Sequence, residues 1–98
     1  MRRAARIDGN HTAVVEALRA IGCTVQSLAS VHGGVPDLLC GMRGVNVLLE
    51  VKDGSLPPSA RVLTTMELDW QAAWGGQVQT VNSPEEAQRV VIAHCVRR

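Results

Sequence analysis

The chain has 98 residues, a formal net charge of +1 and an apolar fraction of 46%. This length suits a single domain, residues 1–98, and the composition is that of a globular protein rather than a disordered or fibrous one. No apolar run approaches the roughly 20 residues that cross a bilayer, and no apolar stretch of a secretory signal follows the basic start, so we expect a soluble, intracellular protein. Because the chain lacks Tyr and Phe, the composition predicts a core of Val, Leu, Ala and Ile with Trp70 and Trp74.

The cysteines exclude two further classes of small protein. Cys23, Cys40 and Cys95 are odd in number and lack CxxC spacing, which argues against a disulfide framework and against a structural zinc site. We expect reduced thiols, with Cys23 and Cys40 as small core residues.

The first half of the chain predicts a helix and three strands. Apolar residues recur at helical spacing from 10 to 21, and Gly22 supplies the left-handed stop. Three strand-like segments follow at 23–29, 35–40 and 45–52. Glycine-containing turns separate them, which favours an antiparallel meander.

The second half begins with a loop at 53–62 that contains two prolines. Helical spacing returns at 63–74, and residues 77–81 predict a fourth strand. Ser83 and Glu86 have the spacing of a capping box that would open a last helix. The expected order is therefore α-β-β-β-α-β-α.

Charged residues interrupt two of the strand-like segments, "GVPDLL" at 34–39 and "NVLLEVKDG" at 46–54. Alternation along a strand places Glu50 and Lys52 on one face. Antiparallel pairing through the short turn would bring Asp37 beside them. Two carboxylates and an ammonium suit metal-assisted phosphodiester hydrolysis, because hard oxygen ligands hold Mg²⁺ or Mn²⁺ and the lysine can orient water or neutralise developing charge. The alternative is a structural ion pair at the edge of a sheet.

The combination of "PD" and "ExK" resembles the PD-(D/E)xK nuclease superfamily. Together with the Pro-rich loop, "WGG" and "SPEEAQRVV", it is similar to a stand-alone virus-type replication-repair nuclease (VRR-NUC) domain of the kind that bacteriophages encode. The resemblance implies a restriction-endonuclease-like core with a mixed four-stranded sheet flanked by helices. It also implies that Asp37, Glu50 and the main-chain carbonyl of Val51 hold Mg²⁺ or Mn²⁺, with Lys52 as the catalytic lysine.

The same resemblance implies a homodimer that cleaves branched DNA such as Holliday junctions during DNA repair, in the cytoplasm of a bacterial or phage-infected cell. Two alternatives stay open. One is a nuclease with little shape preference that nicks duplexes or cleaves flaps or ends, and the other is a nonhydrolytic DNA-binding or assembly subunit with the same fold.

Three more residues are candidates for the site. Glu67 is a carboxylate on the otherwise apolar face of the helix at 63–74, where relatives in the resembled family often carry glutamine. We expect it at the site, as a further ligand or catalytic carboxylate, or at its rim. Asn10 suits a helix cap but is also a possible metal ligand, and Asp8 is the second candidate for that role.

The basic residues near the N-terminus and in the loop are the expected DNA contacts. A net charge of +1 does not by itself imply a polyanionic partner, so the distribution of charge matters more. We expect Arg2, Arg3 and Arg6, on or beside a flexible arm at 1–7, and Arg61 to contact phosphates, although solvated surface is the alternative.

Overall fold

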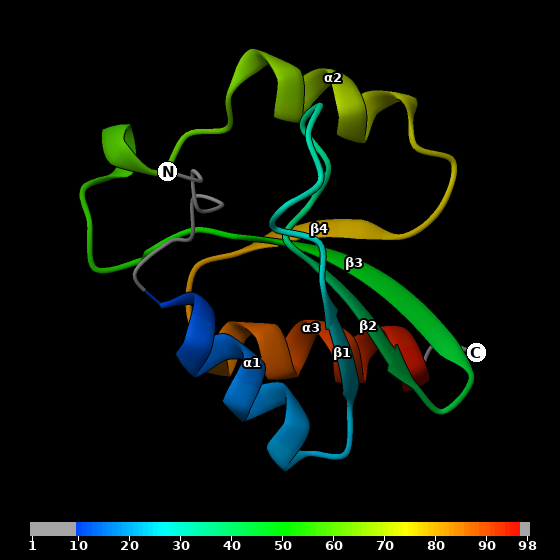
Figure 1. Cartoon of the computed structure of the whole chain (residues 1–98). Coiled ribbons are helices and arrows are strands. Elements are labelled where there is room, and N and C mark those ends of the chain that lie inside the picture. Colours follow the sequence, from blue (N-terminus) through cyan, green and yellow to red (C-terminus); the bar gives the residue numbers. More distant parts are fainter. Residues whose placement is uncertain (1–9, 97–98) are drawn as a thin grey trace, which may run out of the picture.

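The structure is a computed structural model that describes residues 10–96. This part of the chain forms an α/β domain with one open, four-stranded sheet (Figure 1). The strands lie in the order β1 (Thr24–Ser27), β2 (Leu38–Met42), β3 (Val45–Val51), β4 (Val78–Val81). The first three pair antiparallel and β4 joins β3 in parallel, so the sheet is mixed and the predicted meander is confirmed.

Two helices cover one face of the sheet and form the core with it. α1 (His11–Ala20) and α3 (Pro84–Val96) lie on this face, whereas α2 (Thr65–Ala73) lies over the other (Figure 1). Alternate residues of β3 point into the core, and its buried members include Val47, Leu49 and Val51. The core also buries Cys23 and Cys40, as predicted.

The prediction that Trp70 and Trp74 belong to the core is wrong. No residue of α2 is buried, and Trp74, just after the helix, is 47% exposed. The two indoles instead stack on each other, with centroids 4.6 Å apart. The physical reason lies in the open face of the sheet, where polar residues such as Asn46 and Glu50 leave too little apolar surface for a helix to bury itself on.

β2 begins at Leu38, three residues later than predicted, so Asp37 lies in a bend just before the strand. Pro36 has no N–H to donate to the sheet and is fully buried instead. The following hairpin turns at Arg43 and Gly44, whose φ values of 53° and 79° are those of a type I′ turn. This tight turn sets the register that pairs Leu38 with Leu49.

The start of α3 differs from the predicted capping box. At α3, Ser83 Oγ accepts from the Glu86 N–H, but Glu86 Oε1 accepts from the Asn82 N–H at 2.7 Å rather than from that of Ser83.

The loop before α2 contains a short 3₁₀ turn, η1 (Pro58–Ala60). Among the helices of residues 10–96, none has the length and apolarity needed to span a membrane.

Candidate metal and catalytic site

Glu50 is the central residue of the site. It is the penultimate residue of β3 and faces the side of the sheet over which α2 lies, yet only 3% of its surface is exposed. Oε1 is buried and receives no hydrogen bond from any residue that the structure describes. A buried carboxylate oxygen without a donor is costly unless a proton or a cation satisfies it.

Asp37 lies beside Glu50, as the sequence predicts. Its Oδ2 accepts a hydrogen bond of 2.7 Å from the main-chain N–H of Val51. The register of β2 and β3 produces this contact, because Leu38 pairs with Leu49 and Asp37 therefore comes level with the end of β3. The hydrogen bond orients the Asp37 carboxylate and leaves its second oxygen to meet a ligand.

Lys52 completes the predicted trio and joins it to α2. Its Nζ lies 3.5 Å from Glu50 Oε2 and 3.1 Å from Glu67 Oε1. The ammonium therefore has a carboxylate from the strand and another from the helix. The structure thus brings together four of the predicted side chains, Asp37, Glu50, Lys52 and Glu67.

The pKa values follow from this crowding of charges. Burial, followed by the negative charges of Asp37 and Glu67, raises the pKa of Glu50 to about 9, although Lys52 opposes the shift. For Glu67, burial favours the neutral form, but hydrogen bonds from the Thr64 N–H and the Lys52 ammonium outweigh it and lower the pKa. Glu50 is accordingly the group that holds a proton near neutral pH, and Glu67 is ionised.

Glu67 has a structural role that the sequence analysis missed. Its Oε1 accepts from the Thr64 N–H at 2.9 Å, and the Thr64 hydroxyl accepts from the Glu67 N–H at 3.1 Å, which is a complete capping box at the start of α2. The Thr-x-x-Glu pattern at 64–67 is the signal that could have revealed it. The same Glu67 oxygen therefore caps the start of α2 and accepts a hydrogen bond from the Lys52 ammonium.

Gly34 also helps to place Glu67 over the sheet. Its backbone has a φ of 84°, and a Cβ atom there would overlap the main-chain carbonyl of Met66. Only glycine therefore allows the loop before Asp37 to approach the first turn of α2 so closely. In the sequence, Gly33 and Gly34 appeared only as a turn.

The donor set fits a hard divalent cation. Within residues 10–96, no group of three or more His, Cys, Asp or Glu side chains is arranged to hold a metal. The predicted ligands are two carboxylates, Asp37 and Glu50, with the carbonyl of Val51, and Mg²⁺ is usually bound by one or two carboxylates with water and substrate phosphate. Glu50 Oε1 receives no hydrogen bond and lies beside the negative charge of Asp37. A cation bound there would offset the free-energy cost of burying the Glu50 carboxylate.

The other candidates lie elsewhere. Asn10 makes no side-chain cap, contrary to the better-favoured expectation: its Nδ2 donates to the carbonyl of Asn82 at 3.1 Å, and its Oδ1 has no partner among the described residues. With Asp53 and Arg61 it lines a separate pocket, and Arg61 Nε donates to the Leu56 carbonyl at 2.8 Å. Asp8, Arg2, Arg3, Arg6 and the predicted arm at 1–7 lie outside the described residues.

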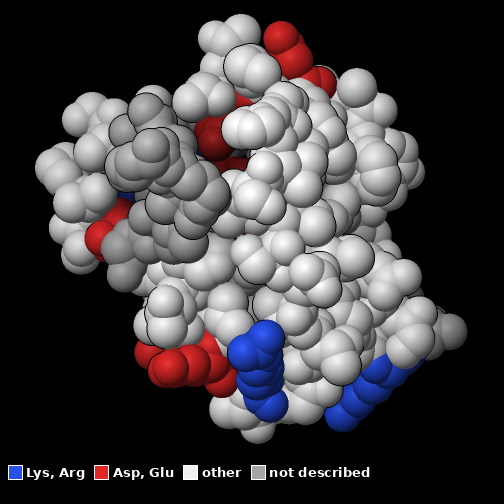
Figure 2. Space-filling view, viewed as in Figure 1, with Lys and Arg blue, Asp and Glu red and all other residues white. Residues whose placement is uncertain are grey.

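The charge distribution around the site is acidic. In Figure 2, acidic atoms are recessed in a hollow beside α2, whereas the basic areas in this view lie at the opposite end, one of them next to an exposed acidic area. A phosphate approaching the hollow would be repelled unless a cation were bound there.

Comparisons of the chain with protein-family models, with curated proteins and with solved structures found no match. Its function is therefore inferred from the chemistry of its own residues.

Proposed function

We propose that the protein is a DNA endonuclease that depends on Mg²⁺ or Mn²⁺ and has a restriction-endonuclease-like core. One observation carries the proposal: the buried Glu50, with an oxygen that lacks a donor, lies beside Asp37 and Lys52 at the end of β3. Clustered ionisable groups with strongly shifted pKa values are typical of functional sites.

A purely structural ion pair accounts for only part of this arrangement. Lys52 does pair with Glu50 and Glu67, as a structural role would require. A structural pair would not need a third carboxylate, Asp37, whose charge raises the pKa of Glu50 further. When Glu50 is ionised, three carboxylates face one ammonium around a buried group, and this excess of negative charge favours a cation in place of the Glu50 proton.

Each residue of the proposed site would have a separate role in phosphodiester hydrolysis. Asp37, Glu50 and the Val51 carbonyl would hold the metal ion, which when bound supplies polarisation of the phosphate and a bound water of lowered pKa. Lys52, whose Nζ is 3.5 Å from Glu50, would neutralise charge that develops on the phosphate or orient the attacking water. Glu67 would act on the reaction through Lys52, because its Oε1 holds the ammonium in place.

We further propose that the substrate is branched DNA, such as a Holliday junction, and that the active form is a homodimer. Two copies would present two sites to two strands. Exposed apolar side chains favour a partner surface, and several of them lie in the loop before α2 and in α2 itself: Leu56, Val62, Met66 and Leu68.

The test is a panel of labelled linear, flap and four-way DNAs incubated with Mg²⁺ or Mn²⁺. We expect cleavage that prefers branched DNA, and we expect Lys52→Ala and Asp37→Asn to abolish cleavage with little loss of DNA binding. Glu16→Gln, which removes an exposed carboxylate on α1, is the control. Equal cleavage of all DNAs would support a nuclease without shape preference, and binding without cleavage would support a nonhydrolytic subunit. Substantial turnover by Lys52→Ala would refute the assigned site.

A further inference from the structure

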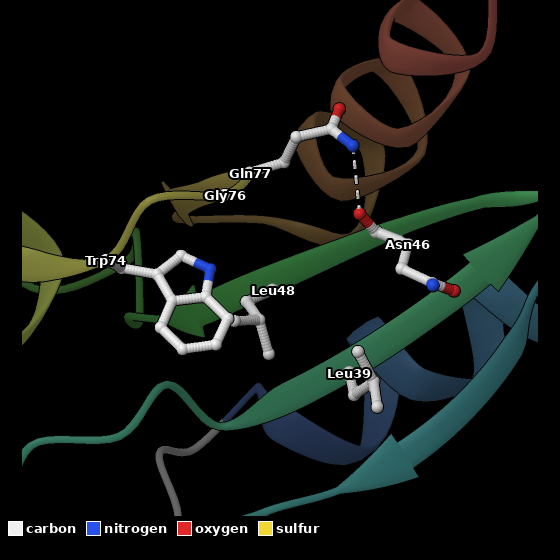
Figure 3. A pocket seen from close by; sticks show the side chains of 6 residues that line it. All are labelled: Leu39, Asn46, Leu48, Trp74, Gly76 and Gln77. Carbon is white, nitrogen blue, oxygen red and sulfur yellow. Dashed lines mark hydrogen bonds between the residues drawn. The ribbon is translucent and has the colours of Figure 1, made fainter.

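A second pocket lies on the same face of the sheet as Glu50 (Figure 3). It has a volume of about 350 Å³, and its lining residues are Leu39, Asn46, Leu48, Trp74, Gly76 and Gln77. Leu48 and Glu50 are two residues apart on β3 and therefore point to the same side, with Cα atoms about 6.6 Å apart for an ordinary strand. The pocket thus adjoins the proposed catalytic site along β3.

Trp74 forms an aromatic wall whose position is constrained from two sides. One face of its indole stacks on Trp70, which leaves 47% of the residue exposed. Gly76 packs against the ring so closely that a Cβ atom there would lie 3.0 Å from Trp74 Nε1. In Figure 3 the indole lies beside Leu48 and forms one side of the pocket over β2 and β3.

The remaining lining is apolar with amide groups at one side. Gln77 Nε2 donates to the main-chain carbonyl of Asn46 at 3.1 Å, and the Asn46 side-chain amide points away from Gln77 and Trp74 (Figure 3). None of the described residues that line the pocket is charged. A phosphate or a carboxylate would therefore find no counterion, whereas a flat, neutral group with polar edges would find both stacking and hydrogen-bonding partners.

We propose that this pocket binds one unpaired nucleobase of the DNA substrate, next to the phosphate that is cleaved. This inference rests on the proposed nuclease function and specifies how the substrate is held. The base would stack on Trp74 over Leu39 and Leu48, and the Asn46 side chain would turn to bring its amide to the edge of the base. Enzymes that hold unstacked bases use such pockets, with aromatic or apolar walls and hydrogen bonds to the edge of the base. Branched DNA that carries an unpaired nucleotide, such as a flap, would supply such a base at little cost, since no base pair has to be broken.

The test uses flap DNA with one unpaired nucleotide at the branch, and the same DNA with an abasic site there, in Ca²⁺ so that binding is measured without cleavage. Trp70 and Trp74 are the only Trp residues, and the chain has no Tyr or Phe, so intrinsic emission reports on this pair alone. We expect the intact DNA, but not the abasic DNA, to change this emission. Anisotropy should show Trp74→Ala weakening binding of the intact DNA by roughly 5- to 150-fold.

Three variants make the result specific. Trp74→Phe should restore most of the binding, because phenylalanine still offers a face for stacking. Gly76→Ala should weaken binding without removing the indole, because its Cβ would displace Trp74. Ile92→Ala, which shortens an exposed apolar side chain on the far helix α3, should leave binding unchanged. Circular dichroism would show that each variant is folded.

The effects of Trp74→Ala and of the abasic site should not add, because both remove the same contact. Additive effects, or equal binding of both DNAs by the wild type, would overturn the inference. A shift of the monomer–dimer distribution in Trp74→Ala without a base-dependent effect would also overturn it and assign the pocket to a contact between copies. Cleavage of the same flap with Mg²⁺ tests the nuclease function separately. Cleavage without base-dependent binding would refute only the proposed base pocket. Base-dependent binding without cleavage would refute only the proposed nuclease activity.

Discussion

Replacing Glu50 by glutamine should stabilise the metal-free protein at neutral and alkaline pH. Glu50 is 3% exposed, and its pKa rises from 4.5 to about 9, mainly because of burial and secondly because of Asp37 and Glu67. Between these two pH values the folded state keeps a proton that the unfolded state releases. The free energy of unfolding must therefore fall as the pH rises, and the stability that the protonated group contributes is complete below pH 4.5 and lost by about pH 9.

The size of the effect follows from the same shift. Each pH unit between the two pKa values is worth about 1.4 kcal/mol, so the wild type should be less stable at pH 7 than at pH 4.5 by about 3 kcal/mol from this group. That is a large part of the roughly 5–15 kcal/mol that stabilises a domain. Glu50→Gln resembles the protonated side chain and leaves Lys52 its contact with Glu67, so this dependence should disappear.

Urea unfolding followed by far-ultraviolet circular dichroism from pH 4.5 to pH 9 measures this difference. Tryptophan emission is a poor probe here, because both indoles lie outside the core. Glu16→Gln, at an exposed position of α1, should follow the wild-type curve. A Glu50→Gln protein that is less stable than the wild type at pH 8, or whose curve runs parallel to it, would refute the reasoning and show that the ionised Glu50–Lys52 pair is favourable.

Divalent ions should narrow the difference in stability between the wild type and Glu50→Gln. A cation that binds only the folded state stabilises it by about 2.7 kcal/mol at a hundredfold excess over its Kd. Adding Ca²⁺ or Mn²⁺ at pH 8 should therefore stabilise the wild type and leave Glu50→Gln nearly unchanged. Equal stabilisation of both proteins would mean that Glu50 is not a ligand.

Four further outcomes are expected. Glu67→Gln should keep the capping box and the activity but change the metal dependence, because it removes a negative charge that acts on Glu50; superimposable metal titrations of this variant and the wild type would contradict that influence. Glu67→Ala should also destabilise α2 by about 1 kcal/mol. Gly34→Ala should speed hydrogen exchange in α2, at residues 65–73, more than Gly33→Ala does. Both glycines have positive φ, but only a Cβ atom at Gly34 meets the Met66 backbone, so equal exchange in the two variants would contradict this. Ca²⁺ should tighten binding of DNA measured by anisotropy, because it reverses the acidic charge of the site, and an unchanged Kd would argue against a cation there. Removing Arg2, Arg3 and Arg6 together should reduce the salt dependence of binding without changing the preferred DNA shape, and an unchanged slope would mean that they make no phosphate contacts.

Local pattern alone determined the order of helices and strands and the trio of charged residues at the end of β3. Alternation in β3 requires Glu50 and Lys52 to share a face, and a two-residue turn at Arg43 and Gly44 permits only a narrow choice of register. Asp37 then comes level with Val51 whether it lies in the strand or, as found, just before it. That these three residues lie together was predictable because short-range geometry links them.

Only the tertiary structure decided where α2 lies and what it contributes. Helical periodicity showed that Glu67, Trp70 and Trp74 share a face, but it could not show that this face would stay half open instead of joining the core. That outcome depends on two other helices, α1 and α3, which already fill the apolar face of the sheet, and on the polar residues, such as Asn46 and Glu50, that alternate with leucines on the other face. The contacts of Glu67 with Lys52 and of Gly34 with Met66 join segments distant in sequence, and such contacts depend on the packing of the whole chain rather than on any local pattern.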